Sequence, residues 1–175
     1  MHAIGVSLGG SLLLDALPQL SGSLQSAALI VAPRRIELSP RTLLPEVGPR
    51  TLGLVWKERE HYGLGGLIPS FGPFKRDIYP LRLAVEPPPG AFGYVESLNA
   101  MLTELELESR AEAVRIPVLL AYGEADRIVP ISQGEQMARR LRSSHLVRVP
   151  AGTHLSTPLS SIARMAVTDW IGRRD

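Results

Sequence analysis

A serine, an aspartate and a histidine in this chain have the types and the order that nucleophilic catalysis requires. Ser7 lies at the centre of the pentapeptide Gly-Val-Ser-Leu-Gly, residues 5–9. A serine on a sharp turn from strand to helix adopts a strained backbone, and small residues two positions before and after it remove side chains that would collide. Such a turn exposes the hydroxyl at a helix N-terminus, where the N–H of Leu8 can stabilise a developing oxyanion. The alternative is a glycine-rich turn that happens to contain a serine.

The chain also offers a base for this serine and an acid to hold the base. A serine hydroxyl is a weak nucleophile at neutral pH and needs a histidine that a carboxylate orients. Asp126 lies in Gly-Glu-Ala-Asp-Arg-Ile-Val-Pro, residues 123–130, directly after an apolar segment, and His154 follows the next apolar segment. Both are therefore expected at the carboxyl ends of strands, where open parallel sheets assemble their sites. Glu124 is an alternative acid, although it lies closer to the end of its strand.

Short apolar segments are expected to form the strands that position these residues. Residues 27–32 form a continuous apolar run that ends at Pro33, and residues 116–122 form a second run. Runs of this length that are apolar on both faces are typical of interior strands of a parallel sheet. Residues 146–149 predict a last, shorter strand, and a stub at residues 1–4 leads into the serine.

Helical patterns alternate with these strands. A leucine-rich stretch from Leu8 to Leu17 predicts a short helix that Pro18 ends. A helix is expected to begin near Ser132, capped by that serine together with Glu135 in a capping box. Two further helices are expected, over residues 94–113 and 162–170. The alternation predicts an α/β fold with a mostly parallel sheet flanked by helices.

The stretch from residue 33 to residue 92 has a different character. It holds ten of the fifteen prolines, with glycines scattered among them. Only short helices are compatible with that composition, and a long stretch of this kind inside a domain is typically a lid or a binding loop. We therefore interpret residues 33–92 as a cap-like insert.

The overall composition excludes several classes of function. The chain has 175 residues, 45% of them apolar, and a formal charge of +2 from 19 basic and 17 acidic residues that are interspersed. No basic tract of the kind that nucleic-acid binding needs is present, and the absence of cysteine excludes disulfides and cysteine-ligated zinc. No apolar run approaches the roughly 20 residues of a membrane span, and no leader pattern precedes the serine motif. We expect a cytoplasmic protein.

The serine pentapeptide, the acid loop and the histidine loop together resemble the C-terminal two-thirds of an α/β-hydrolase of the esterase, lipase and serine-peptidase type. The order serine, acid, histidine is the order of that family. The resemblance implies that Ser7 is the nucleophile, Asp126 the orienting acid and His154 the general base, with Leu8 in the oxyanion hole. One departure is Thr153, which stands where the family usually has a glycine directly before the histidine.

The resemblance also implies the organisation of the chain and its chemistry. Residues 1–175 would form a single domain that lacks the N-terminal strands of the family, with residues 33–92 as its cap. The expected function is that of a serine hydrolase, which cleaves a carboxylic ester, thioester or amide through an acyl-enzyme on Ser7 without a metal or organic cofactor. Apolar residues of the insert favour a hydrophobic small-molecule acyl substrate; they are Leu64, Leu67, Ile68, Phe71 and Phe74. The alternative is an inactive truncated hydrolase-like fragment, and the sequence leaves the oligomeric state open.

Overall fold

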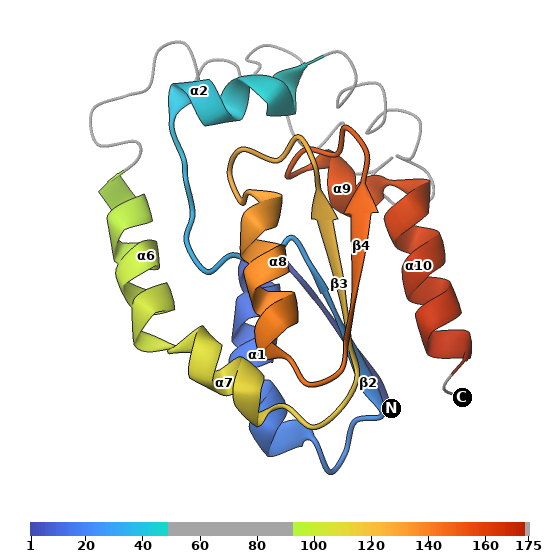
Figure 1. Cartoon of the computed structure of the whole chain (residues 1–175). Coiled ribbons are helices and arrows are strands. Elements are labelled where there is room, and N and C mark those ends of the chain that lie inside the picture. Colours follow the sequence, from blue (N-terminus) through green and yellow to red (C-terminus); the bar gives the residue numbers. More distant parts are fainter. Residues whose placement is uncertain (49–92, 174–175) are drawn as a thin grey trace, which may run out of the picture.

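A parallel four-stranded sheet forms the centre of the computed structural model, which describes residues 1–48 and 93–173 (Figure 1). The strands are β1 (His2–Val6), β2 (Ser26–Ile30), β3 (Val118–Gly123) and β4 (Ser144–Val149), in the spatial order β1-β2-β3-β4. Val6 pairs with Ile30 at the end of β1, and Gly123 pairs with Val149 at the end of β3. Because all neighbours are parallel, the loops that follow the strands lie along one edge of the sheet.

The burial of the strands agrees with their apolar patterns. Every residue of β2 and β3 is buried, as expected for interior strands covered on both faces. In residues 1–48 and 93–173, β1 pairs with β2 alone, and its Ile4 and Val6 are exposed by 52% and 44%. The strand that leads into Ser7 is thus an edge strand of the described sheet.

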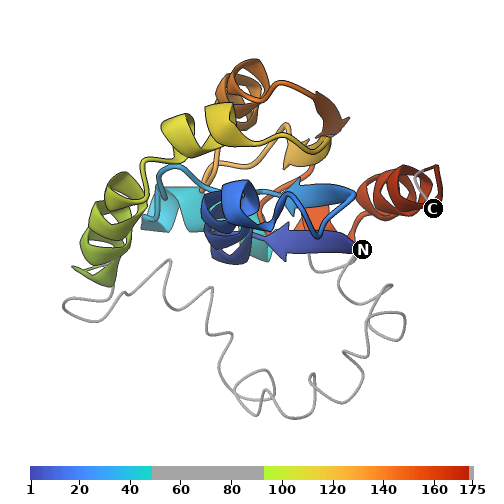
Figure 2. The same cartoon turned by 90° about the horizontal axis from the view of Figure 1, so that it is seen from below.

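Helices cover both faces of the sheet. The helices α1 (Leu8–Leu20), α7 (Leu107–Ala113) and α8 (Ile131–Arg140) pack on one face, and α10 (Ser161–Gly172) packs on the other (Figure 2). The remaining elements are α6 (Gly93–Glu104), α9 (Ser156–Leu159), α2 (Pro40–Leu43) and the 3₁₀ helix η1 (Leu44–Val47). In Figure 1, α2 lies above the carboxyl ends of the strands. None of the described helices has the length and apolar character needed to span a bilayer.

The two faces of the sheet bury different side chains, because alternate residues of a strand point to opposite sides. On the α1 side, Leu29 and Leu120 pack in a large cluster with Leu14 and Leu17. On the α10 side, Ile30, Ala121 and Val149 pack in a smaller cluster with Ala163. The side chains of β2 and β3 therefore join both helical layers to the sheet.

Three expectations about helix boundaries were wrong. Helix α1 continues through Pro18 to Leu20. Pro18 lies in the last turn of the helix, so its missing N–H leaves only one carbonyl without a helical hydrogen bond. The single helix expected over residues 94–113 is two helices, separated at Glu106, which has a φ of 49°. This break lets both Leu102 and Leu107, which a continuous helix would place on different faces, reach the core.

The third wrong expectation concerns the cap of α8, whereas the start of this helix lies close to the expected position. The helix begins at Ile131, directly after Pro130, and Ser132 forms no capping box. The backbone N–H groups of Ile128 and Val129 are bonded instead to Asp126, so the preceding loop is held from within. Of the insert predicted at residues 33–92, the structure describes residues 33–48, where it has only short helices. The remainder, which contains Leu64, Leu67, Ile68, Phe71 and Phe74, lies outside the described part.

Candidate active site

Ser7 lies at the turn between β1 and α1. Its backbone has φ 50° and ψ −130°, a conformation that costs free energy and is concentrated at functional sites. The N–H of Ser7 donates to the carbonyl of Ile30 at 2.8 Å, which ties the turn to the neighbouring strand. The serine side chain is half-buried and begins a helix, as the pentapeptide predicts.

The turn depends on two glycines, one of which differs from the expected pair. A Cβ on Gly5 would lie 2.6 Å from the Cα of Gly10, and a Cβ on Gly10 would lie 2.7 Å from the Cβ of Ala32. A Cβ on Gly9 would have no described atom within 4 Å. The close approach of α1 to the sheet therefore requires Gly5 and Gly10, whereas the pentapeptide pattern predicted that the small residues needed at this turn are Gly5 and Gly9.

The three residues singled out by the sequence form one chain of hydrogen bonds. Ser7 Oγ lies 2.9 Å from His154 Nε2, and His154 Nδ1 lies 3.0 Å from Asp126 Oδ2. The side chain of Asp126 is fully buried and that of His154 is 13% exposed. These residues come from the loops after β1, β3 and β4, at the carboxyl edge of the sheet. Glu124, the alternative acid, is exposed, whereas Asp126 is the acid whose carboxylate contacts the histidine ring.

Both carboxylate oxygens of Asp126 have hydrogen-bond partners. Its Oδ1 accepts the N–H groups of Ile128 at 2.9 Å and Val129 at 2.8 Å, while Oδ2 faces the histidine ring. An ionised carboxylate only accepts hydrogen bonds, so the ring nitrogen Nδ1 is the donor in this pair. The neutral imidazole then has an unprotonated Nε2 directed at the Ser7 hydroxyl. The arrangement suits proton transfer from the serine.

A fourth residue, Glu46, contacts the histidine loop and was not predicted from the sequence. Glu46 lies in η1 and is 2% exposed, and its two carboxylate oxygens accept the N–H groups of His154 and Leu155, each at 2.8 Å. The available sequence signal was an acidic residue in an otherwise apolar segment, Leu-Leu-Pro-Glu-Val. The loop is also bonded internally, since the N–H of Thr153 donates to Ser156 Oγ at 2.7 Å. Thr153, which departs from the family pattern, therefore has a structural part in this loop.

Tyr122 supports the site from the core. Its hydroxyl donates to the carbonyl of Ala32, and its side chain is fully buried. Burial raises the pKa of the Tyr122 phenol far above its usual value of 10.0, and the negative charge of Asp126 raises it further. The phenol stays protonated at any physiological pH and holds the segment after β2 against β3.

The start of α1 supplies a backbone donor next to Ser7. Leu8 is the first residue of α1, so its N–H has no acceptor within the helix and lies at the positive end of the helix dipole. Among the described residues, no group of three histidine or acidic side chains is placed to hold a metal ion.

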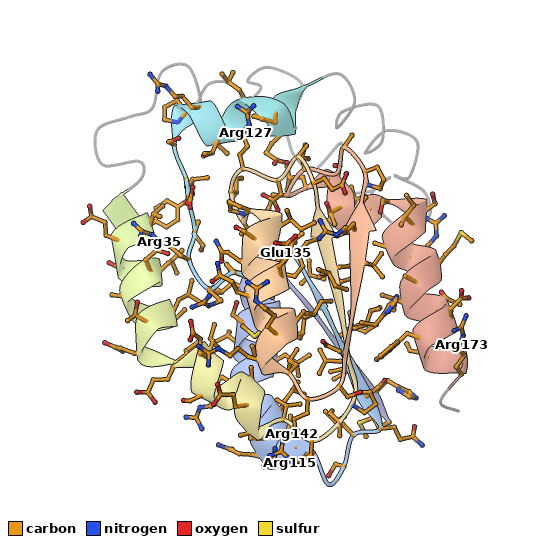
Figure 3. All side chains as sticks on the ribbon, in the orientation of Figure 1. Arg35, Arg115, Arg127, Glu135, Arg142 and Arg173 are labelled. Carbon is orange, nitrogen blue, oxygen red and sulfur yellow. The ribbon has the colours of Figure 1, made fainter. Side chains whose placement is uncertain are left out.

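Arginines lie at both ends of the sheet, and a cleft lies at the end away from the serine. Figure 3 shows Arg127 at the carboxyl edge of the sheet, with Arg115 and Arg142 at the opposite end. Arg140, from one of the arginine pairs of the sequence, binds Glu108 and Glu112 on α7. A cleft of about 590 Å³ lies at the amino ends of β3 and β4, against the C-terminal end of α10; its lining residues include Leu119, His145, Trp170 and Arg173. Because Ser7 is at the other end of the sheet, this cleft is separate from the site.

Comparison with known families and curated sequences gives one match. Residues 102–172 match the family model of the TAP-like proteins. This stretch contains β3, the loop with Asp126, β4 and the loop with His154. Among curated proteins, no significant match is found.

Solved structures similar to this chain share its architecture at low sequence identity. An alpha/beta hydrolase enzyme, MGS-MChE2, from the metagenome of sediments of the Mar Chica lagoon in Morocco has a TM-score of 0.60 and 12% identity, and the match covers 100% of this chain and 62% of that one. A thermophilic esterase from Thermogutta terrifontis has a TM-score of 0.57 and 22% identity over 99% of this chain and 65% of that one. A monoacylglycerol lipase from Paleococcus ferrophilus has a TM-score of 0.57 and 15% identity over 99% and 68%. The chain thus spans somewhat less than two thirds of the length of the first two structures.

Proposed function

We propose that the chain is a serine hydrolase of the α/β-hydrolase superfamily, which cleaves carboxylic esters through an acyl-enzyme on Ser7. The family model matched by residues 102–172 and the similar solved structures support the superfamily. Thioesters and amides are chemically related alternatives as substrates. The observation that carries the proposal is the unbroken chain of contacts from Ser7 Oγ through the His154 ring to Asp126, with distances of 2.9 and 3.0 Å. The naming of two similar structures as an esterase and a monoacylglycerol lipase favours ester bonds.

In the first half of the reaction, Ser7 Oγ attacks the carbonyl carbon of the substrate while His154 Nε2 takes the hydroxyl proton. Asp126 stabilises the imidazolium that forms and keeps the ring in its orientation. The carbonyl oxygen becomes an oxyanion, which the N–H of Leu8 at the start of α1 can bind. The bond to the leaving alcohol then breaks, the alcohol takes the proton from His154, and the acyl group remains on Ser7.

In the second half, water replaces the alcohol. His154 Nε2 takes a proton from the water as the hydroxide attacks the acyl carbon, and the proton returns to Ser7 Oγ when the ester to the enzyme breaks. The product is a carboxylic acid, and every step uses groups that the described residues supply. We further propose that the acyl group is hydrophobic, because the insert at residues 33–92 is rich in apolar side chains.

Labelling with a fluorophosphonate tests this proposal directly, because Ser7 Oγ would attack the phosphorus and displace fluoride. We expect the purified chain to be labelled on one serine, and labelling to disappear in Ser7→Ala. The matched control is Ser23→Ala, which removes an exposed serine from the turn after α1 and should leave labelling unchanged. Hydrolysis of a series of p-nitrophenyl esters of increasing acyl length would then measure substrate preference.

A folded chain that reacts with neither the probe nor the esters would contradict the proposal. Circular dichroism and a cooperative thermal transition establish folding independently of activity. That outcome would favour the alternative of an inactive hydrolase-like fragment.

A further inference from the structure

Glu46 is a buried carboxylate that does not belong to the Ser7–His154–Asp126 chain but contacts the loop that carries the histidine. It is 2% exposed, and its two oxygens accept the N–H groups of His154 and Leu155, each at 2.8 Å. The two partners are 108 and 109 residues away in the sequence. A buried charge is costly unless it is well bonded, so this contact is a specific one.

The contact completes the bonding of the histidine loop. Four consecutive backbone N–H groups, of residues 153–156, donate to side-chain oxygens. Thr153 and Ser156 accept each other's N–H groups, at 2.7 and 3.3 Å, so these two bonds lie within the loop and would move with it. The other two N–H groups are those that Glu46 accepts. Among the acceptors of these four groups in the described part of the chain, Glu46 is the one that belongs to another segment, and it ties the backbone of the loop to η1.

The charge of Glu46 also has the sign that the proposed reaction needs. Hydrogen bonds from N–H groups to a carboxylate are shorter and stronger than those to a neutral acceptor. A negative charge held against the backbone of His154 favours the imidazolium that forms when Nε2 takes the serine proton. Two carboxylates therefore contact this residue, Asp126 at the ring and Glu46 at the backbone.

We propose that Glu46 is a positioning residue for His154, whose carboxylate holds the histidine loop so that Nε2 stays within hydrogen-bond reach of Ser7 Oγ. This inference rests on the proposed serine hydrolase function. It assigns to the beginning of the 33–92 insert a direct part in the site: the segment anchors the base.

Glu46→Gln tests the inference with little change of shape. The glutamine oxygen can accept one N–H, but its NH₂ group then faces the other N–H, and the charge is lost. We expect the second-order rate of fluorophosphonate labelling at Ser7 to fall by about 10- to 100-fold, as for other small displacements of reacting groups. The acidic limb of the pH–rate profile should move to lower pH, because loss of the negative charge disfavours the imidazolium. Glu37→Gln, which removes an exposed carboxylate from the same segment, is the matched control and should change neither quantity.

Glu46→Asp keeps the charge but shortens the side chain by one methylene. We expect it to label more slowly than the wild type, while the acidic limb stays close to the wild-type position. If Glu46→Gln fails to fold, this variant carries the test. Wild-type labelling rates and pH profiles in either folded variant would overturn the inference, because a carboxylate that only stabilised the fold would change the unfolding temperature without moving the pH profile.

A second readout separates this inference from the proposed function. Hydrogen exchange at the backbone N–H groups of His154 and Leu155, followed by NMR, requires no reaction at Ser7. The exchange should become faster in Glu46→Gln and stay unchanged in Glu37→Gln, because Glu46 accepts both N–H groups. If the wild type resists labelling but the exchange becomes faster in Glu46→Gln, the proposed function fails and the positioning contact stands. If the wild type is labelled but neither readout responds to Glu46→Gln, the positioning role fails and the proposed function stands.

Discussion

The two oxygens of Asp126 have separate partners. Oδ1 accepts two backbone N–H groups from its own loop, and Oδ2 faces the ring of His154. The first pair of bonds fixes the rotation of the carboxylate, so that the second bond fixes the plane and the tautomer of the imidazole. The acid is therefore held by its loop before it holds the base.

Asp126→Asn should separate geometry from charge at this position. The asparagine can keep the Oδ1 bonds, but its NH₂ group would face Nδ1 and favour the tautomer with a protonated Nε2, which cannot accept the serine proton. We expect the rate of ester hydrolysis to fall on the order of 10⁴-fold. Steady-state kinetics with a p-nitrophenyl ester would measure it. Glu124→Gln, at the exposed alternative acid, is the control, and an equal loss in that variant would contradict the assignment of Asp126.

The sequence predicted these residues to different extents. Ser7, Asp126 and His154 lie in short local patterns directly after apolar strands, and the parallel sheet brings the three loops to one edge, where they form one hydrogen-bonded chain. Their catalytic roles remain predictions. Glu46 could not be found in this way, because its partners lie more than 100 residues away and no local pattern marks a side chain that binds backbone groups.

At the level of elements, the contact between α1 and the sheet decides how closely Ser7 approaches its neighbours. Gly10 lies in the first turns of α1, where its Cα faces Ala32 just beyond β2. A glycine inside a helix destabilises it by roughly 0.5–1 kcal/mol relative to alanine. The close packing at Gly10 offsets that cost, whereas Gly9, one residue earlier, has no described atom near the position of a Cβ.

Gly9→Ala and Gly10→Ala should therefore have opposite effects on the free energy of unfolding. A Cβ at Gly10 would meet the Ala32 Cβ at 2.7 Å, and since that atom is fixed to the backbone, the helix itself must move. We expect Gly10→Ala to lower the free energy of unfolding by about 1–3 kcal/mol. Gly9→Ala should raise it by about 0.5–1 kcal/mol through helix propensity. Urea unfolding measures both, and equal shifts of the same sign would contradict the packing described for α1.

The order and type of the elements were largely predictable, whereas their ends were not. The apolar runs at residues 27–32 and 116–122 correspond to β2 and β3, because burial on both faces leaves a clear signal in the sequence. The break at Glu106 and the start of α8 depend instead on which side chains reach the core and on bonds made by Asp126. Such tertiary contacts override local helix signals.

For the molecule as a whole, Tyr122 joins several layers of the structure. Its hydroxyl donates to the carbonyl of Ala32, which follows β2, and its ring lies against Gly134 of α8, where a Cβ would come within 2.4 Å. Burial raises the pKa of this phenol far above 10.0. The native state therefore retains a proton that the unfolded chain releases in alkaline solution.

This linkage predicts how stability depends on pH. Because the folded-state pKa of Tyr122 is raised, its contribution is fully present below the usual value of 10.0 and is lost as the pH rises above it. Tyr122→Phe should lower the free energy of unfolding by about 1–3 kcal/mol near neutral pH, since it leaves a buried carbonyl without its donor. The difference from the wild type should shrink above pH 10.0. Urea unfolding at several pH values tests this, with the exposed Tyr94→Phe as control; a constant difference would contradict it.

The contact between Ser7 and His154 joins residues 147 positions apart. On the ribosome, the nucleophile emerges among the first residues of this segment, and its base only after nearly all of the segment has been made. Closing so long a loop adds to the entropy that folding must overcome, and contacts of large sequence separation form slowly. The hydroxyl of Ser7 therefore has no base during most of the synthesis of the segment. The hydrogen bond between Ser7 and His154 can form only after both residues have been synthesised and the intervening residues have folded.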